Sequence, residues 1–140
     1  MRTPSVRSLH LPPFLAALAL PLASLAEVKP VAQSADLHAK DKVRLVDLAA
    51  DLKGAKQLYL VVNDLGDQAC DWSDWIEPVL VMADGTTKDL TTLTWKWAEA
   101  GSGKPAVGKN YSGGPLKVSG KVYAKGVGTH ANSVIGYDNP

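Results

Sequence analysis

The feature that most constrains the fold is a series of short β-prone segments, each followed by a turn signal. Val, Ile, Leu, Thr, Tyr and Trp gather in these segments, and Gly, Pro, Asn or Asp separate them. The segments are residues 58–62, 76–82, 87–90, 91–98, 116–118, 122–124 and 134–137. No internal repeat and no sustained helical periodicity accompanies them. The pattern predicts an all-β fold, a sandwich or a barrel.

Three of the segments permit finer predictions. Residues 58–62 read Leu-Tyr-Leu-Val-Val, apolar on both faces, which predicts a central strand covered on both sides. Asp84-Gly85 is a strong turn signal, so residues 87–90 are expected to form a hairpin with residues 76–82. Trp95 and Trp97 would share one face of an extended segment, and core packing is expected for at least one of them.

The N-terminus is typical of a secretory signal. Arg2, Arg7 and His10 precede an apolar run over residues 11–22, and small residues follow at Ser24 and Ala26. The run is too short for a good membrane span. We therefore expect an exported protein cleaved after residue 26, with a linker or edge segment over residues 27–42 and one domain over residues 43–140.

The charge balance limits the possible binding partners, and the cysteine content limits the possible disulfides. Fifteen Lys and Arg face 14 Asp and Glu, and no basic stripe is visible, which argues against nucleic acid and against a membrane surface after signal cleavage. Cys70 is the single cysteine, so no internal disulfide forms, and it is expected to be a small buried hydrophobe.

Residues 63–77 form an unusually acidic stretch. Like charges this close repel one another unless solvent or a shared cation separates them. Calcium takes several carboxylate oxygens at once, and the candidate ligands are Asp64, Asp67, Asp71 and Asp74. The spacing does not match an EF-hand, and the alternative is a solvated loop whose acidic residues cap turns.

Aromatic and amide side chains suggest sugar binding. Trp72 and Trp75 lie in or beside the acidic stretch, and an indole offers an apolar face for stacking and an N–H donor. His130 and Asn132 would point to the same side of an extended segment and can both donate and accept hydrogen bonds. The glycines Gly126 and Gly128 would allow close backbone approach. The alternative is a buried His130 that pins a loop.

No nucleophile elbow, phosphate loop or paired metal-ligand histidines accompany these residues, so no enzyme activity is expected from this chain. The segments Asp71-Trp-Ser-Asp-Trp-Ile-Glu-Pro78 and Lys125-Gly-Val-Gly-Thr-His-Ala-Asn-Ser133 do, however, resemble the NPCBM family, which is also named after glycosyl hydrolase family 98. The resemblance runs over about residues 43–138.

This resemblance implies a galactose-binding-like jelly-roll β-sandwich that binds galactose-type sugars, often holds a structural calcium and tethers a larger modular protein. It places the functional surface at Trp72, Asp74, Trp75, Glu77, His130 and Asn132. Two departures are visible. Gly101-Ser102-Gly103 lacks a tryptophan that relatives commonly carry, and relatives continue with further strands beyond Pro140, so the sandwich is expected to lack its last strands. The alternative function is a structural or protein-interaction module without a sugar site.

Overall fold

The computed structural model describes residues 29–38, 40–67 and 69–140, and the predicted signal over residues 1–26 lies outside them. The described residues contain ten strands and one short 3₁₀ helix. They are β1 (Gln57–Val62), β2 (Trp72–Ile76), β3 (Val79–Val81), β4 (Thr87–Asp89), η1 (Leu90–Thr92), β5 (Trp97–Glu99), β6 (Ala106–Val107), β7 (Leu116–Val118), β8 (Lys121–Tyr123), β9 (Gly126–His130) and β10 (Ser133–Asp138). The described part of the chain contains no helix long and apolar enough to cross a membrane.

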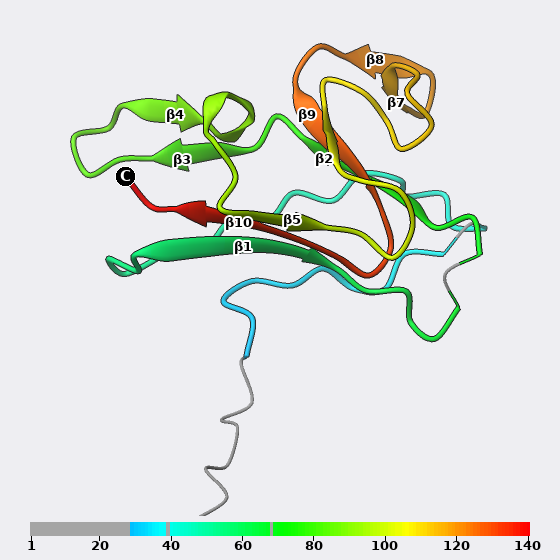
Figure 1. Ribbon diagram of the computed structural model, residues 1–140, viewed down its shortest axis with the longest axis horizontal. Coiled ribbons are helices and arrows are strands. Elements are labelled where there is room, and N and C mark those ends of the chain that lie inside the picture. Colours follow the sequence, from blue (N-terminus) through cyan, green and yellow to red (C-terminus); the bar gives the residue numbers. More distant parts are fainter. Residues whose placement is uncertain (1–28, 39, 68) are drawn as a thin grey trace, which may run out of the picture.

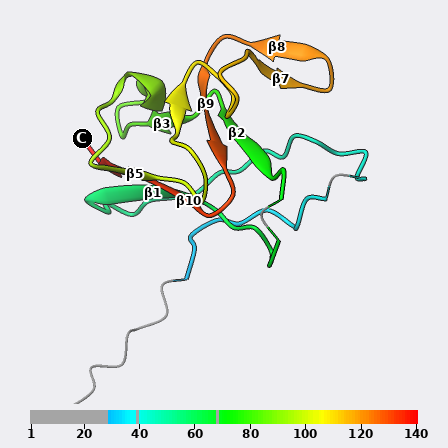
Figure 2. The ribbon, with the colours of Figure 1, turned by 45° about the vertical axis from the view of Figure 1, so that its right-hand side comes forward.

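The strands form two three-stranded sheets and two hairpins (Figure 1). One sheet has the order β1-β10-β5 and the other has the order β2-β9-β6, while β3 pairs with β4 and β7 pairs with β8. Neighbouring strands in these sheets are antiparallel. Figure 2 shows the β7–β8 hairpin standing apart from the β1-β10-β5 sheet. The arrangement confirms the predicted all-β sandwich.

The core lies where the sheets meet. Its buried members are Leu80, Leu90, Val127, Ile135 and Tyr137, which come from β3, η1, β9 and β10. Leu58 and Leu60 of β1 pack against them from the inner face of the first sheet. Trp95 also packs there, and its indole N–H donates to the hydroxyl of Tyr137 at 3.1 Å.

Local turn chemistry produced a correct prediction for the β3–β4 hairpin. Val79, Leu80 and Val81 pair with Asp89, Lys88 and Thr87. The Asp84 carboxylate accepts a hydrogen bond from the Thr86 N–H at 2.9 Å, and Gly85 has a φ of +82°. Only the sequence between the two strands is needed to specify this turn.

Four strand predictions were wrong. Residues 91–98 are a strand only from Trp97 onward, because the 3₁₀ helix η1 takes up the start of that segment. The β1 strand lies at the edge of its sheet, and its outward side chains Tyr59 and Val61 are 53% and 49% exposed. Residues 76–82 do not form one strand, because Glu77 has a φ of +48° and turns the chain before Pro78. Trp95 and Trp97 do not share a face: Trp95 packs on the core, whereas Trp97 is 54% exposed.

An ion pair joins the β4–η1 corner to the start of β9. Lys125 Nζ lies 2.9 Å from Asp89 Oδ2, and the other Asp89 oxygen accepts from the N–H and the hydroxyl of Thr91. These contacts, with Lys125 first, lower the pKa of the Asp89 carboxyl from 3.8 to about 2. The ionised carboxylate therefore stabilises the fold above about pH 4, and this contribution is lost as the pH falls toward 2.

We expect Asp89→Asn to lower the free energy of unfolding by about 1–2 kcal/mol at pH 7, because it removes the ion pair and weakens the cap of η1. Urea unfolding of both proteins between pH 7 and pH 2 measures the effect. The gap between the two proteins should close below pH 4, and a gap of constant size would contradict the assignment.

Candidate functional site

The two segments that predicted the site lie side by side. β2 and β9 are antiparallel neighbours, with Trp72 opposite His130, Ser73 opposite Thr129 and Asp74 opposite Gly128. The sequence analysis predicted that the two segments lie close together, but it expected Trp72 on a polar loop. In the structure Trp72 is the first residue of strand β2. Backbone pairing fixes the positions of Trp72 and His130 more rigidly than a loop contact would.

Trp72, Tyr111 and His130 form an aromatic cluster at the end of this strand pair. The ring centroids of Trp72 and Tyr111 lie 5.5 Å apart, and those of Tyr111 and His130 lie 4.8 Å apart with an edge-on geometry. Trp72 is 53% exposed, whereas His130 is 5% exposed. The cluster therefore grades from an exposed indole to a buried imidazole, with the phenol of Tyr111 between them.

A loop pressed against β9 delivers Tyr111. The Gly128 N–H donates to the Lys109 carbonyl at 3.0 Å, and a Cβ at position 128 would overlap that carbonyl and the Cα of Asn110. Only a residue without a side chain allows this approach. The Asn110 side chain then accepts from the backbone N–H groups of Ser112 and Gly114, which holds the loop in shape.

Tyr111 also has a polar anchor. Its hydroxyl lies 2.7 Å from the hydroxyl of Ser102. Ser102 belongs to the Gly101-Ser102-Gly103 segment, where the sequence departs from the resemblance. A Cβ at Gly103 would lie 2.8 Å from the Tyr111 ring, so this segment packs closely along the phenol.

The imidazole of His130 keeps one nitrogen unpaired among the described residues. Its Nδ1 is buried and accepts or donates no hydrogen bond there. An unpaired buried nitrogen is costly unless another group can reach it. His130 is therefore buried, as the alternative interpretation expected. Its Nδ1, however, makes no hydrogen bond that would fix a loop of the described chain.

The turn between β9 and β10 completes the polar part of the site. Asn132 is exposed and has a φ of +58°, so it does not continue the strand of His130, and the predicted common face for these two residues is wrong. Asn132 Nδ2 instead donates to Asp64 Oδ2 at 2.7 Å. The Gly66 N–H and then Asn132 lower the pKa of the Asp64 carboxyl.

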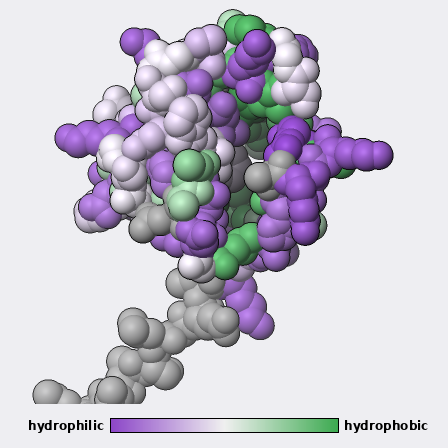
Figure 3. Space-filling view, turned by 90° about the vertical axis from the view of Figure 1, so that its right-hand side faces the viewer, coloured by the Kyte–Doolittle hydropathy of each residue, from purple (hydrophilic) through white to green (hydrophobic). Residues whose placement is uncertain are grey.

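Backbone hydrogen bonds fix this turn to two other loops. The Ala131 N–H donates to the Asp71 carbonyl at 2.9 Å, and the Gly101 N–H donates to the Ala131 carbonyl at 3.0 Å. Figure 3 looks onto this end of the molecule and shows a mostly hydrophilic surface. The acidic stretch, the β9–β10 turn and the loop after β5 thus meet around the aromatic cluster.

Asp74 lies two residues after Trp72 on β2, opposite Gly128. One of its carboxylate oxygens is buried and has no hydrogen-bond partner among the described residues. Burial raises the pKa of the Asp74 carboxyl above 3.8. The protonated form is thus relatively favoured in the folded state, so this group destabilises the fold as the pH rises through its pKa.

Two predicted site residues lie elsewhere. Trp75 is opposite Val127 and packs against the hydrophobic core. Glu77 follows the far end of β2, where its N–H donates to the Lys125 carbonyl at 3.2 Å. The strand β2 separates Glu77 from Trp72, and its four steps of ~3.3 Å span about 13 Å before Glu77 turns the chain.

Local hydrogen bonds from backbone N–H groups to its carboxylates shape the acidic stretch. Asp64 accepts from the Gly66 N–H at 3.0 Å and Asp67 accepts from the Ala69 N–H at 2.9 Å, which are Asx turns. Among residues 29–38, 40–67 and 69–140, no three His, Cys, Asp or Glu side chains form a group that could hold a metal ion. Calcium binding by Asp64, Asp67, Asp71 and Asp74 stays a prediction.

Sequence reasoning missed Tyr111 and gave Cys70 the wrong environment. Tyr111 is an aromatic residue within the polar segment Asn110-Tyr-Ser-Gly-Gly114, and that unusual placement is the signal that could have marked it. Cys70 is exposed rather than buried and has a φ of +64°. Its carbonyl accepts from the Trp72 N–H at 3.0 Å, so it shapes the turn before β2.

A family model described as the NPCBM/NEW2 domain matches residues 24–81 and 86–139. Neither a curated protein nor a solved structure matches the chain. The matched ranges include β2, β9, Tyr111 and the β9–β10 turn, which are the elements that build the site. The chain therefore belongs to the NPCBM/NEW2 domain family, a family of carbohydrate-binding modules.

Proposed function

We propose that the chain binds galactose-type glycans at the cluster of Trp72, Tyr111 and His130. The family assignment supports a carbohydrate ligand. The observation that carries the choice of site is the half-exposed indole of Trp72 beside the Tyr111 ring, with polar groups nearby. Aromatic faces stack on the C–H face of a sugar, and a few polar groups then fix its orientation.

The polar groups suit a sugar hydroxyl pattern. Asn132 offers an amide and Asp64 an ionised carboxylate on the exposed side of the site. The hydroxyls of Tyr111 and Ser102 can each donate or accept. A galactose-type ring has its axial hydroxyl on one side and a continuous C–H patch on the other, which suits an aromatic wall next to carboxylate and amide groups.

The same proposal assigns the chain to an exported modular protein. The basic start, apolar run and small residues over residues 1–26 support export. Tethering is the role we propose, because the family is one of non-catalytic carbohydrate-binding modules. We also propose a structural calcium in the acidic stretch. Urea unfolding of the chain in calcium chloride and in EGTA tests it, because bound calcium would raise the free energy of unfolding.

We expect galactose or lactose to quench or shift the intrinsic tryptophan fluorescence of the full chain. Trp72→Ala and Tyr111→Ala should each weaken binding about tenfold, because each removes roughly 1.4 kcal/mol of aromatic contact. Tyr123→Ala is the matched control, since Tyr123 lies on the separate β7–β8 hairpin and contacts Lys121.

Two outcomes decide the proposal. If no galactose-type sugar or glycan-array member binds the folded chain, the protein-interaction alternative replaces it. If sugars bind but Trp72→Ala and Tyr111→Ala leave the affinity unchanged, the ligand class survives and the assigned cluster is wrong.

A further inference from the structure

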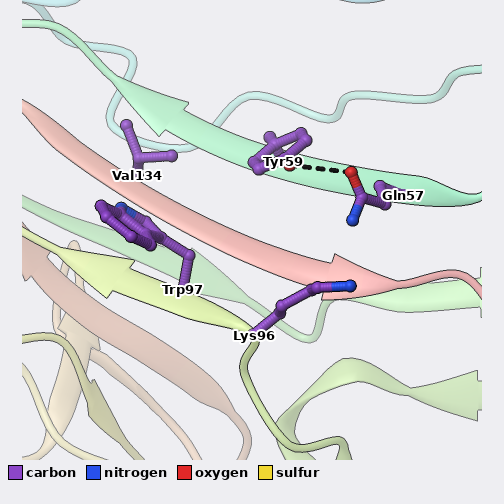
Figure 4. Close-up of a pocket in the computed structure, with 5 residues that line it drawn as sticks. All are labelled: Gln57, Tyr59, Lys96, Trp97 and Val134. Atoms are coloured by element: carbon purple, nitrogen blue, oxygen red, sulfur yellow. Dashed lines mark hydrogen bonds between the residues drawn. The ribbon is translucent and has the colours of Figure 1, made fainter.

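A second aromatic surface lies on the outer face of the β1-β10-β5 sheet, away from the cluster. Tyr59, Gly136 and Trp97 lie opposite one another across the three strands. Tyr59 is 53% exposed and Trp97 is 54% exposed. Together with Gln57, Lys96 and Val134 they line an open groove of about 360 Å³ (Figure 4). We call this surface the sheet-face groove.

Gly136 lies between the two aromatic residues of the groove. A Cβ at position 136 would lie 2.9 Å from the Tyr59 ring and 3.3 Å from the Cβ of Trp97. The glycine thus lets the Tyr59 ring rest against the backbone of β10 while its other face meets solvent. An aromatic side chain often packs over a glycine in a neighbouring strand and so stabilises the sheet. One ring is enough for that role, so it does not explain why Tyr59 and Trp97 both stay half exposed.

Polar side chains of both signs stand at one end of the groove. The Tyr59 hydroxyl donates to Gln57 Oε1 at 3.0 Å, and Lys96 Nζ lies 3.0 Å from Asp138 Oδ1. Lys96 and then Gln57 lower the pKa of the Asp138 carboxyl, so it stays ionised. Figure 4 shows Gln57 and Lys96 toward one end and Val134 toward the other.

These properties select among possible occupants. Lys96 is paired with Asp138 and Glu99 is exposed near Val134, so the groove offers no excess of positive charge to a phosphate chain. A stable protein partner buries about 800 Å² on each side, more than two rings present. A neutral oligosaccharide instead presents C–H faces to the rings and hydroxyls to paired donors and acceptors.

We propose that the sheet-face groove binds a segment of a neutral oligosaccharide chain, as a second site separate from the Trp72–Tyr111–His130 cluster. Tyr59 and Trp97 lie on the strands either side of β10, about 10 Å apart at the usual strand spacing, which suits contact with successive sugar units of a chain rather than with a single unit. Its volume falls at the lower end of the ~300–1,000 Å³ range of ligand sites, enough for a short stretch of sugar.

Hydroxyl-radical footprinting of the unmodified full chain tests this directly. Trp72 and Trp97 are the two half-exposed indoles of the described chain, and mass spectrometry reports their oxidation separately. Cellohexaose, laminarihexaose and mannohexaose are the probes, with galactose for the first site and hexagalacturonate as the charged control. We expect at least one neutral hexasaccharide to slow Trp97 oxidation at least threefold, and hexagalacturonate to leave it unchanged.

Variants then locate the binding. Trp97→Ala should weaken hexasaccharide binding at least tenfold in calorimetry, while Trp72→Ala should change it less than twofold. No protection of Trp97 by any neutral hexasaccharide overturns the proposal, even if galactose still protects Trp72. Protection of Trp97 that depends on protein concentration, with a dimer seen by light scattering, would also overturn it, because a second copy would then be the occupant.

Discussion

Replacing Gly128 with alanine is expected to lower the free energy of unfolding by about 3 kcal/mol, near the upper end for overpacking by one methyl group. The added Cβ would overlap the Lys109 carbonyl and the Cα of Asn110, both of which are backbone and cannot rotate away. Moving that loop also breaks the 3.0 Å hydrogen bond from Gly128 to Lys109. Urea unfolding followed by tryptophan fluorescence measures the loss.

Gly114→Ala is the matched control for this variant. Gly114 lies in the loop that contains Lys109 and Asn110. Like Gly128 on β9, it does not have a positive φ. A Cβ at Gly114 would come no closer than 3.4 Å to the Asn110 side chain. Its effect should stay below about 1 kcal/mol. Equal losses in the two variants would show that the loop does not press on β9. A partly folded Gly128→Ala protein should also lose sugar binding, since the displaced loop carries Tyr111.

Local sequence signals predicted the parts of the fold that depend on neighbouring residues. The Asp84-Gly85 turn and the β3–β4 hairpin are of this kind. The contact between the β2 and β9 segments is not local. The family resemblance predicted that the two segments lie close together, but as neighbouring loops and not as paired strands. The burial of Trp95 was expected for one of the two tryptophans, but the sequence did not determine which one packs on the core.

The errors have a common physical cause, because exposure depends on tertiary neighbours. The sequence Leu-Tyr-Leu-Val-Val is apolar on both faces, yet Tyr59 and Val61 are about half exposed because they lie on the outer face of the β1-β10-β5 sheet, away from the core. Glu77 is near Trp75 in sequence, but one strand carries it to the opposite end of the sheet from Trp72. Tyr111 reaches the cluster only because Gly128 lets a remote loop approach β9.

The wrong prediction for β1 has a functional counterpart. A strand covered on both faces would have buried Tyr59, and the sheet-face groove would not exist. The alternation along β10 produces both surfaces of its sheet: Ile135 and Tyr137 face the core, while Val134 and Gly136 face the groove. The same strand begins after the Asn132 turn, so it connects the groove to the polar side of the aromatic cluster.

This central position makes Ile135 the most sensitive core residue to test. Its side chain is fully buried, and its strand pairs with β1 through Leu60 and with β5 through Ala98. We expect Ile135→Ala to lower the free energy of unfolding by about 2–5 kcal/mol, from lost burial and the cavity left behind. Val81→Ala is the control, because Val81 is 73% exposed on β3 and should cost less than about 0.5 kcal/mol. If urea unfolding gave similar midpoints for both variants, the core would not lie between these sheets, and the opposite orientations of Ile135 and Gly136 on which the groove depends would be wrong.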